Sequence, residues 1–419
     1  MELVESFSGV RGKDLSHELV VKYAAAFNRE LDKGKIILAG DTRPTTETLK
    51  DSFKLSLLSR EIIDIGVCPT PVFSHAIIDQ EAAGGIMITA SHNPPEFNGW
   101  KLFGKDGAIF TPERMEKTIH NSKTTIFQRG SQPRLGHEDP FHPYLEQHQD
   151  LIDEVKDLAP KVLIDANGSA VIPLIKKSGL GFKTVNMQPG MFEHEIEPTE
   201  EALKALPKMM KEQDCILGAA FDCDADRVEF ILPGRYIDGG KTLAVLAMTL
   251  EKGDTMIVND ATSHIVRQMA EGIKVIEAPV GETNIVQAMD RHNAKLGGEG
   301  SCGGVIFPPG RCRDGFLTLL HIMKILKERP DAFEKLPERA YLNEQLKCTD
   351  PDIMINKALK HFKDHEITRQ QGSVKILMDD GFLWLRKSLT EPGILRMIAD
   401  AKDEKEAKEL ISKGRNLLK

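Results

Sequence analysis

Three aspartates alternate with small residues in the segment DCDADR, residues 222–227. The apolar run Ile216–Phe221 before them predicts a buried strand, so the carboxylates leave that strand close together. Carboxylates this close repel one another unless a cation lies between them, and their hard oxygen atoms suit Mg²⁺. An EF-hand is excluded, because its sixth and twelfth positions would be Arg227 and Pro233 instead of Gly and Glu. We therefore predict a magnesium site whose protein ligands include Asp222, Asp224 and Asp226.

A serine in a rigid turn is the second candidate for chemistry. The segment TASHNPPEFNGWK, residues 89–101, places Ser91 at the end of an apolar strand and before His92, Asn93 and two prolines. The turn directs the hydroxyl out of the sheet. It is not a nucleophile elbow, because the flanking glycines of G-x-S-x-G are missing. A turn-forming serine with a local backbone hydrogen bond is the alternative interpretation.

A glycine-rich loop, GGEGSCGG at residues 297–304, presents one carboxylate and one hydroxyl. Residues 298–303 match G-x-G-x-x-G, but a dinucleotide-binding loop must begin a helix, and here the sequence continues VIFPP. We reject that interpretation. Glu299 and Ser301 are instead suited to hydrogen-bonding the hydroxyl groups of a sugar.

A cluster of basic and hydroxyl side chains lies in RKSLTEP, residues 386–392, with a further arginine nearby. Arginine can grip a phosphate with two hydrogen bonds, and hydroxyls add donors. The residues predicted to form this phosphate cradle are Arg386, Ser388, Thr390 and Arg396. An exposed basic strand end is the alternative. Two short segments, GVRG with Arg11 and GDTRP with Arg43, fit the same phosphate-binding theme.

Short β-branched runs alternate with amphipathic stretches in three successive parts of the chain, which predicts α/β structure with largely parallel strands. The second part includes a helix expected over Thr199–Lys211. From about residue 341 the pattern changes to that of a small α+β domain. Segments rich in Pro, Gly and charge near residues 128–143, 233–240 and 328–337 are candidate linkers. The expected domains are 1–143, 144–240, 241–337 and 338–419.

The composition excludes several classes of protein. The chain has 419 residues, with 55 Lys and Arg against 63 Asp and Glu, so its net charge is −8. We expect no nucleic-acid and no membrane partner, because a basic patch and a long apolar segment are both missing. The N-terminus does not resemble a signal peptide, which favours a cytoplasmic protein. The six cysteines form no CxxC pair and are expected to be free thiols.

Taken together and in this order, the four segments resemble those of the α-D-phosphohexomutase family, which includes phosphoglucomutases, phosphomannomutases and phosphoglucosamine mutases. The resemblance spans nearly the whole chain. It implies three related α/β domains with mixed sheets plus a smaller C-terminal α+β domain, arranged around a central cleft. In chain order these domains would carry the phosphoserine, the metal, the sugar and the phosphate.

The resemblance also implies roles for single residues. Ser91 would be phosphorylated, and its phosphate would join the three aspartates in binding Mg²⁺. Arg11 and Arg227 would neutralise the transferring phosphoryl group, Lys101 would serve as acid and base, and His92 would supply a further donor or acid. Glu299 and Ser301 would hold the sugar, while Arg386, Ser388, Thr390 and Arg396 would hold the phosphate that is not reacting.

The implied reaction interconverts hexose 6-phosphate and hexose 1-phosphate through a hexose 1,6-bisphosphate, which also serves as activator. The substrate, a small phosphosugar, is left open among phosphoglucosamine, phosphomannose and phosphoglucose, and a homodimer is left open. The sequence departs from the family pattern at several positions. Among them, Cys223 and Leu389 stand where glycine is usual, which is unfavourable if the backbone there needs a positive φ.

Two other functions remain open at this point. A phosphatase that forms an aspartyl phosphate would use the Asp-x-Asp of residues 222–224, although Asp226 stands where that motif normally has Thr or Val. A phosphosugar-binding relative without catalytic activity is the second, motivated by the replaced glycines.

Overall fold

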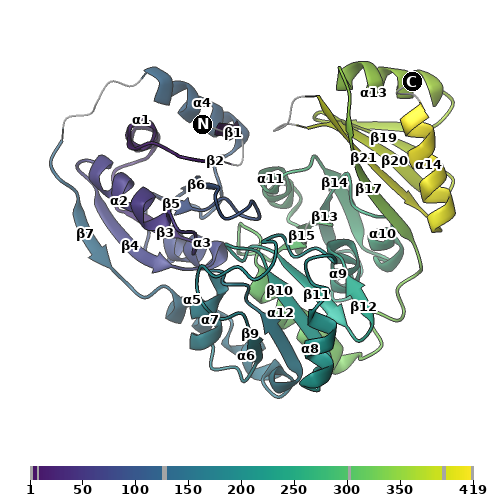
Figure 1. The fold of residues 1–419 in the computed structure, drawn as a ribbon, viewed down its shortest axis with the longest axis horizontal. Coiled ribbons are helices and arrows are strands. Elements are labelled where there is room, and N and C mark those ends of the chain that lie inside the picture. Colours follow the sequence, from purple (N-terminus) through teal and green to yellow (C-terminus); the bar gives the residue numbers. More distant parts are fainter. Residues whose placement is uncertain (1–2, 7–8, 125–129, 301–302, 389–392, 417–419) are drawn as a thin grey trace. The chain divides into compact units, whose positions relative to one another are not determined.

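The computed structural model describes residues 3–6, 9–124, 130–300, 303–388 and 393–416, which form four β-sheets with helices against them (Figure 1). The chain divides into two compact units. Unit 1 contains residues 1–239 and 302–330, and unit 2 contains residues 240–301 and 331–419. The prediction of a mixed α/β fold is confirmed.

The first sheet of unit 1 has the strand order β1-β2-β6-β5-β3-β4-β7. Its strands β3, β4, β5 and β7 run parallel, whereas β1, β2 and β6 pair in antiparallel fashion. Every residue of β3 and β5 is buried, as expected for strands covered on both faces. The strands are β1 Leu3–Ser6, β2 Gly9–Gly12, β3 Ile36–Gly40, β4 Glu61–Val67, β5 Gly84–Ile88, β6 Asn98–Gly104 and β7 Arg134–His137.

Helix α1 packs against α2 and α4 over one face of this sheet. Trp100 of β6 lies at the centre of that core, with edge-on contacts to Tyr23 and Phe53 at 5.2 and 5.3 Å between ring centroids. Because side chains alternate along a strand, the next residue, Lys101, points to the opposite face. The helices are α1 His17–Glu30, α2 Thr46–Ser56, α3 Thr70–Asp79, α4 Pro112–Thr124, α5 Phe141–Gln147 and α6 Gln149–Val155.

The second sheet of unit 1 has the order β12-β11-β10-β8-β9. Its elements are β8 Val162–Asp165, β9 Lys183–Val185, β10 Leu217–Phe221, β11 Val228–Leu232, β12 Arg235–Ile237, η1 Ala159–Lys161, α7 Val171–Lys177 and α8 Leu206–Glu212. The helix expected from Thr199 is therefore wrong in its first half. Pro207 in the first turn of α8 explains the late start, because its ring would clash with a preceding helical turn.

The returning segment of unit 1 contains β16 Gly304–Ile306 and α12 Gly315–Glu328. Asp314 caps this helix by accepting a hydrogen bond from the backbone nitrogen of Leu317 at 2.8 Å. A Cβ on Gly315 would lie 2.9 Å from the carbonyl oxygens of both Ala225 and Arg227. Glycine thus allows the start of α12 to approach the aspartate loop closely.

Unit 2 begins with parallel strands β13, β14 and β15 and their helices. These elements are α9 Gly239–Ala247, β13 Thr255–Asn259, α10 Ile265–Met269, β14 Lys274–Ala278, α11 Glu282–His292 and β15 Leu296–Glu299. An antiparallel sheet follows, in the order β17-β21-β20-β19-β18. Its elements are β17 Ala340–Lys347, α13 Pro351–His361, β18 Ile367–Gln370, β19 Ser373–Met378, β20 Gly381–Lys387, β21 Ile394–Ala401 and α14 Glu404–Asn416.

Buried polar contacts join the two parts of unit 2. Asp260, directly after β13, accepts hydrogen bonds from Ser373 and from Trp384 Nε1, the latter at 3.0 Å. Asp400 of β21 accepts from Ser263 and from Arg339. Strand β20, which ends in the predicted phosphate cradle, and its neighbour β21 are thereby bound to residues 260–263, which follow β13.

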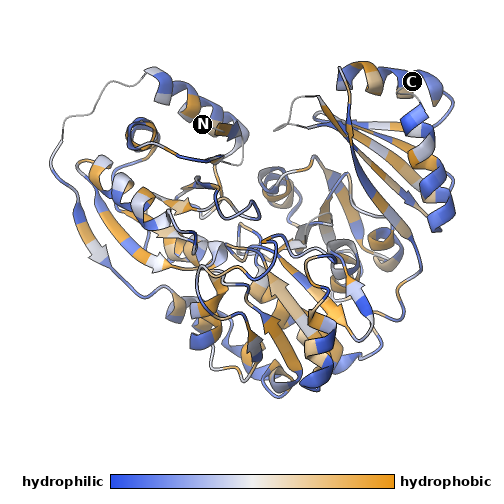
Figure 2. Cartoon of the chain, in the orientation of Figure 1, coloured by the Kyte–Doolittle hydropathy of each residue, from blue (hydrophilic) through white to orange (hydrophobic). Residues whose placement is uncertain are grey.

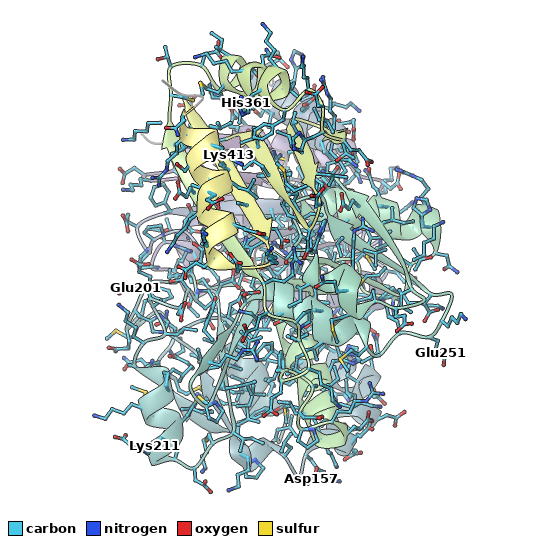
Figure 3. The ribbon with its side chains drawn as sticks, turned by 90° about the vertical axis from the view of Figure 1, so that its right-hand side faces the viewer. Asp157, Glu201, Lys211, Glu251, His361 and Lys413 are labelled. Carbon is cyan, nitrogen blue, oxygen red and sulfur yellow. The ribbon has the colours of Figure 1, made fainter. Side chains whose placement is uncertain are left out.

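Hydrophilic residues lie on the outer sides of helices, and apolar residues are concentrated in the strands. The strands are mainly orange on a hydropathy scale, and the outer sides of α8 and α14 are blue (Figure 2). Six exposed polar side chains, three of them from helices, are labelled in Figure 3: Asp157, Glu201, Lys211, Glu251, His361 and Lys413. Among the helices of the described ranges, none is both long and apolar enough to cross a membrane.

Candidate functional site

The three predicted metal ligands form one buried cluster between β10 and β11. Asp222, Asp224 and Asp226 are each 0% exposed, and one carboxylate oxygen from each lies within 4.8 Å of the others. Asp224 Oδ1 and Asp226 Oδ1 accept no hydrogen bond from any residue that the structure describes. Buried carboxylate oxygens are normally paired, so these two fit a bound cation. Three oxygen donors of this kind match the preference of Mg²⁺.

The carboxylates of this loop differ in their proton affinity. Burial, followed by the negative charges of Asp226 and Asp224, raises the pKa of Asp222 well above its usual value. Burial opposes ionisation of Asp226 as well, but the positive charges of Arg313 and Lys101 outweigh it and lower the pKa of that carboxyl. The cluster therefore holds more negative charge than it can stabilise alone, and an added divalent cation would favour ionisation of Asp222.

Cationic side chains surround the cluster. Lys101 Nζ lies 2.7 Å from Asp224 Oδ2 and 3.0 Å from Asp226 Oδ2. Arg313 Nη2 lies 2.6 Å from the same Asp226 oxygen. Arg227 donates its backbone N–H to Asp222 Oδ1 at 3.2 Å. Two predicted residues, Lys101 of β6 and Arg227, thus contact the aspartates of this loop, and Arg313 does so as well.

Ser91 lies beside the same loop. Its hydroxyl donates to Asp222 Oδ2 at 3.1 Å, and its backbone N–H donates to Thr89 Oγ1 at 2.8 Å. Its φ of 51° is in the left-handed region, which is unusual for a residue other than glycine. Such a backbone persists only when its surroundings hold it there, and strain of this kind gathers at functional sites.

Two further predicted residues lie near Ser91. Burial is the main cause that lowers the pKa of His92 well below its usual value, and the charges of Arg227 and Arg11 lower it further. The imidazole is therefore neutral at pH 7. Its Nδ1 is buried and has no hydrogen-bond partner among the described residues. Arg11 of β2 is the strand partner of Gly99 of β6. Its positive charge therefore lies in the same part of unit 1 as Ser91.

The sugar-binding candidate Glu299 is the last residue of β15 in unit 2 and is 5% exposed. Its Oε1 accepts hydrogen bonds from the backbone nitrogen of Gly281 at 2.8 Å and from Asn259 Nδ2 at 3.4 Å. Gly281 has a φ of 126°, which only glycine adopts readily. These contacts hold the carboxylate in one orientation. Ser301 lies outside the described residues.

The phosphate-binding candidates lie at the end of the antiparallel sheet of unit 2. Arg386 of β20 and Arg396 of β21 are direct partners across the strand pair. Burial is the main cause that lowers the pKa of Arg386, against the opposing charges of Asp260 and Glu299. Its buried Nε has no acceptor among the described residues. Ser388 donates its backbone N–H to the Ile394 carbonyl at 2.8 Å. Thr390 lies outside the described residues.

The structure thus gathers the predicted residues into two clusters, one in each unit. Unit 1 holds Arg11, Ser91, His92, Lys101, Asp222, Asp224, Asp226 and Arg227, and unit 2 holds Glu299, Arg386, Ser388 and Arg396.

Sequence patterns missed Arg313 and Thr70. Thr70 donates its hydroxyl to Asp224 Oδ2 at 2.7 Å. Thr70 lies 154 residues before its partner, and no local pattern could have linked them. For Arg313 the only available signal was its place directly before an Asp that caps a helix.

One expectation, that Arg43 contributes to phosphate binding, is wrong. The guanidinium of Arg43 is buried and hydrogen-bonds to Asp41 and to four backbone carbonyls of the Ser91 turn. Those contacts leave it no N–H group for a ligand.

The replaced glycine at Cys223 proves compatible with the local backbone. Cys223 is not among the residues with a positive φ, whereas Ala225 of the same loop has a φ of 51°. The cysteine side chain is 1% exposed, and its Sγ lies 3.7 Å from Thr42 Oγ1. The backbone therefore does not require glycine at this position. Leu389, the other replaced glycine, lies outside the described residues.

Family models and named proteins of one family match this chain. Residues 5–129 match the family model of phosphoglucomutase/phosphomannomutase α/β/α domain I, and residues 238–341 match that of α/β/α domain III. A phosphoglucomutase/phosphomannomutase of Thermococcus kodakarensis is 33% identical, with 98% of this chain and 96% of the relative covered. A Thermococcus gammatolerans protein named "Probable phosphoglucosamine mutase" is 29% identical, with 98% and 97% covered.

Solved structures show the same fold. A phosphoglucomutase/phosphomannomutase family protein from Burkholderia thailandensis superposes with a TM-score of 0.87. The match covers 99% of this chain and 96% of the other at 22% identity. The similarity therefore extends over the whole chain and includes all four sheets.

Proposed function

The chain belongs to the phosphoglucomutase/phosphomannomutase, or α-D-phosphohexomutase, family of isomerase-type phosphotransferases, and we propose that it interconverts a hexose 6-phosphate and the corresponding hexose 1-phosphate. The observation that carries the proposal is the contact of Ser91 Oγ with Asp222 Oδ2 at 3.1 Å, inside a buried loop of three aspartates. A hydroxyl beside a cation site and several basic groups is the equipment that phosphoryl transfer needs.

In the proposed reaction Ser91 carries a phosphoryl group in the resting enzyme. A sugar hydroxyl attacks that phosphorus, the P–Oγ bond breaks, and a hexose 1,6-bisphosphate forms. The bisphosphate then returns its other phosphoryl group to Ser91, so that one phosphate has moved and none has been consumed. Lys101 donates a proton to the leaving Ser91 Oγ and takes up the proton of the attacking hydroxyl, and Arg11 and Arg227 neutralise charge on the transferring oxygens. His92, neutral by its environment, donates a hydrogen bond.

Mg²⁺ would be held by Asp222, Asp224, Asp226 and the phosphate on Ser91, where it would neutralise charge on the phosphoryl oxygens. The two buried carboxylate oxygens, Asp224 Oδ1 and Asp226 Oδ1, that no described residue hydrogen-bonds support this assignment. Added hexose 1,6-bisphosphate would act as an activator, because it can phosphorylate an empty Ser91.

We assign the residues of unit 2 to substrate binding. Glu299 and Ser301 bind the sugar hydroxyls, and Arg386, Ser388, Thr390 and Arg396 bind the phosphate that is not reacting. The adjacent charges of Arg386 and Arg396 support an anion site. The four sheets support the four domains 1–143, 144–240, 241–337 and 338–419. The candidate hexoses are glucosamine, mannose and glucose, in line with the names of the two relatives.

The decisive test of this function is detection of the hexose 1-phosphate by ³¹P NMR. Glucose, mannose and glucosamine 6-phosphates are each incubated with the protein, Mg²⁺ and the matching 1,6-bisphosphate, and the 1-phosphate signal is recorded. We expect one or more sugars to equilibrate, and Ser91→Ala to abolish turnover while the protein stays folded. Full activity of Ser91→Ala, or phosphate trapped on Asp222, would overturn the phosphoserine assignment.

A further inference from the structure

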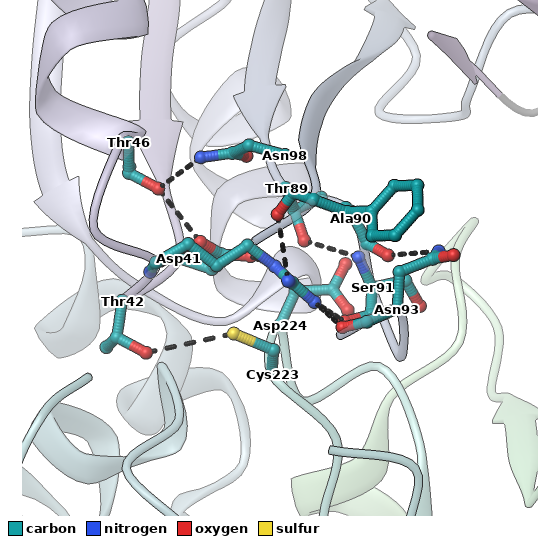
Figure 4. Close-up of polar contacts among 12 residues, drawn as sticks. Asp41, Thr42, Thr46, Thr89, Ala90, Ser91, Asn93, Asn98, Cys223 and Asp224 are labelled. Carbon is teal, nitrogen blue, oxygen red and sulfur yellow. Dashed lines mark hydrogen bonds and ion pairs between the residues drawn. The ribbon is translucent and has the colours of Figure 1, made fainter. Parts of the chain in front are cut away.

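The guanidinium of Arg43 is bound to the backbone of the Ser91 turn. Its Nη2 donates to the carbonyl oxygens of Ser91 at 2.6 Å and Asn93 at 2.5 Å, and its Nη1 donates to those of Pro94 at 2.5 Å and Phe97 at 2.9 Å. Figure 4 shows Ser91 and Asn93 of this turn together with Asp41. One side chain therefore fixes four of the seven carbonyls of residues 91–97.

Asp41 fixes the arginine in turn. Asp41 Oδ2 accepts from Arg43 Nε at 3.1 Å, and Asp41 Oδ1 accepts from the Arg43 backbone nitrogen at 3.0 Å and from Thr46 Oγ1 at 2.9 Å. Arginine has five N–H donors, and these contacts use all five. Both side chains of the ion pair are 0% exposed, so water does not compete for them.

Residues 41–43 also contact the aspartate loop of residues 222–227. Thr42, between the two residues of the ion pair, lies with its Oγ1 3.7 Å from Cys223 Sγ (Figure 4). Arg43 is hydrogen-bonded to the turn that contains Ser91. The Ser91 hydroxyl contacts Asp222, which directly precedes Cys223. Residues 41–43 therefore contact both loops that must meet for phosphoryl transfer, all within unit 1.

We propose that Arg43, held by Asp41, is a positioning residue that fixes the Ser91 hydroxyl against the aspartate loop and maintains the left-handed backbone of Ser91. The proposal rests on the phosphoserine function proposed above. The five guanidinium N–H groups of Arg43 are all used by Asp41 and by four backbone carbonyls, so none is left for the substrate. Lysine cannot replace it, because a single ammonium with three donors cannot span four carbonyls and a carboxylate.

The test compares Arg43→Lys with the parent protein under the conditions of the mutase assay. A displacement of about 1 Å at a reacting group can lower turnover by roughly 10²-fold. We expect kcat to fall by about that factor and KM for the hexose phosphate to stay nearly unchanged, because the substrate contacts remain. A variant with raised KM and unchanged kcat would show that Arg43 binds substrate, and would overturn the proposal.

Arg60 provides a matched control. Its guanidinium also gathers backbone carbonyls, those of Asn28, Leu31, Asp32 and Gly34, but at a distant part of the same sheet. Arg60→Lys removes contacts of the same kind and should keep the parent kcat. An equal loss of kcat in both variants would mean that general destabilisation is the cause, and would contradict a specific positioning role.

Amide hydrogen exchange measures the positioning without any substrate. The backbone N–H groups of Asn93 and Phe97 are hydrogen-bonded within the turn, to the carbonyls of Ala90 and Pro94. In Arg43→Lys these two amides should exchange at least tenfold faster, while those of Ile86 and Met87 in β5 keep their protection. Unchanged exchange at Asn93 and Phe97 would overturn the proposal. If the parent protein interconverts no hexose phosphate, the function fails and this measurement still decides the role of Arg43.

Discussion

Lys101 and Asp224 form a buried ion pair in which the lysine Nζ lies 2.7 Å from Asp224 Oδ2. The same ammonium contacts Asp226, and in this way one lysine partly neutralises a loop that also suits Mg²⁺. The lysine and a bound cation would therefore share two of these carboxylates, those of Asp224 and Asp226.

Replacing Lys101 by Met should destabilise the metal-free protein. Removing one partner of a buried ion pair leaves an uncompensated charge and costs about 3–5 kcal/mol. Mg²⁺ should restore more stability in Lys101→Met than in the parent, because the cation then provides the missing positive charge. Denaturant unfolding in EDTA and in Mg²⁺ measures both effects.

Lys105→Met is the control for this experiment. Its ion pair with Asp32 is exposed on both sides, and exposed pairs contribute about 0–1 kcal/mol. It should respond to Mg²⁺ like the parent protein. An equal response of Lys101→Met and the parent would show that Lys101 and the cation act on different carboxylates.

Replacing Arg386 by Gln should weaken substrate binding with a smaller effect on kcat. A hydrogen bond to a charged group contributes about 2 kcal/mol, which corresponds to a rise in KM of roughly 30-fold. Steady-state kinetics with the hexose phosphate gives both constants. Arg415→Gln, which removes a surface contact with Glu344, should leave them unchanged. A large fall in kcat with constant KM would place Arg386 at the transferring phosphoryl group instead.

Returning residue 223 to the family's glycine should not improve the enzyme. Cys223 is 1% exposed and has no positive φ, so Cys223→Gly removes packing and adds backbone freedom, with an expected loss of about 1–3 kcal/mol. Ala225→Gly, at a φ of 51°, should stay within about 1 kcal/mol of the parent, because relief of strain offsets the lost methyl group. Urea unfolding compares the two, and a more stable Cys223→Gly would refute the argument.

The buried Asp314 should make stability depend on pH. Burial raises its pKa from 3.8 to about 6, against the hydrogen bond from Leu317. The folded state then binds the proton more tightly than the unfolded state. The contribution of Asp314 to stability is therefore largest below about pH 4 and is lost as the pH rises through about 6, by about 3 kcal/mol in total.

The variant Asp314→Asn tests this dependence, because Asn also caps helices and cannot ionise. The stability of the variant relative to the parent should increase between pH 4 and pH 6 and remain constant above. Asp350 is the exposed cap of α13. The stability of Asp350→Asn should differ little from that of the parent at both pH 4 and pH 6. A relative stability of Asp314→Asn that does not change with pH would contradict the raised pKa.

The sequence alone determined the chemistry of the site. Local spacing was enough to find the aspartate loop, Ser91 and Glu299, because their chemical types and the strands before them lie within a few residues. Alternating apolar and amphipathic segments likewise predicted the α/β class. The helix predicted over residues 199–211 is the exception. The apolar periodicity favours it, but the ring of Pro207 allows the helix to begin only at Leu206.

Only the tertiary structure decided which residues contact the aspartates and the Ser91 turn. Arg313 reaches Asp226 across 87 residues, Thr70 reaches Asp224 across 154, and Arg43 grips a turn about 50 residues away. An arginine near a phosphate-binding pattern looks the same in sequence whether it binds an anion or a row of carbonyls. The difference depends on which acceptors the folded chain brings within 3 Å of its five donors, and such distances are set by packing between segments that are remote in sequence.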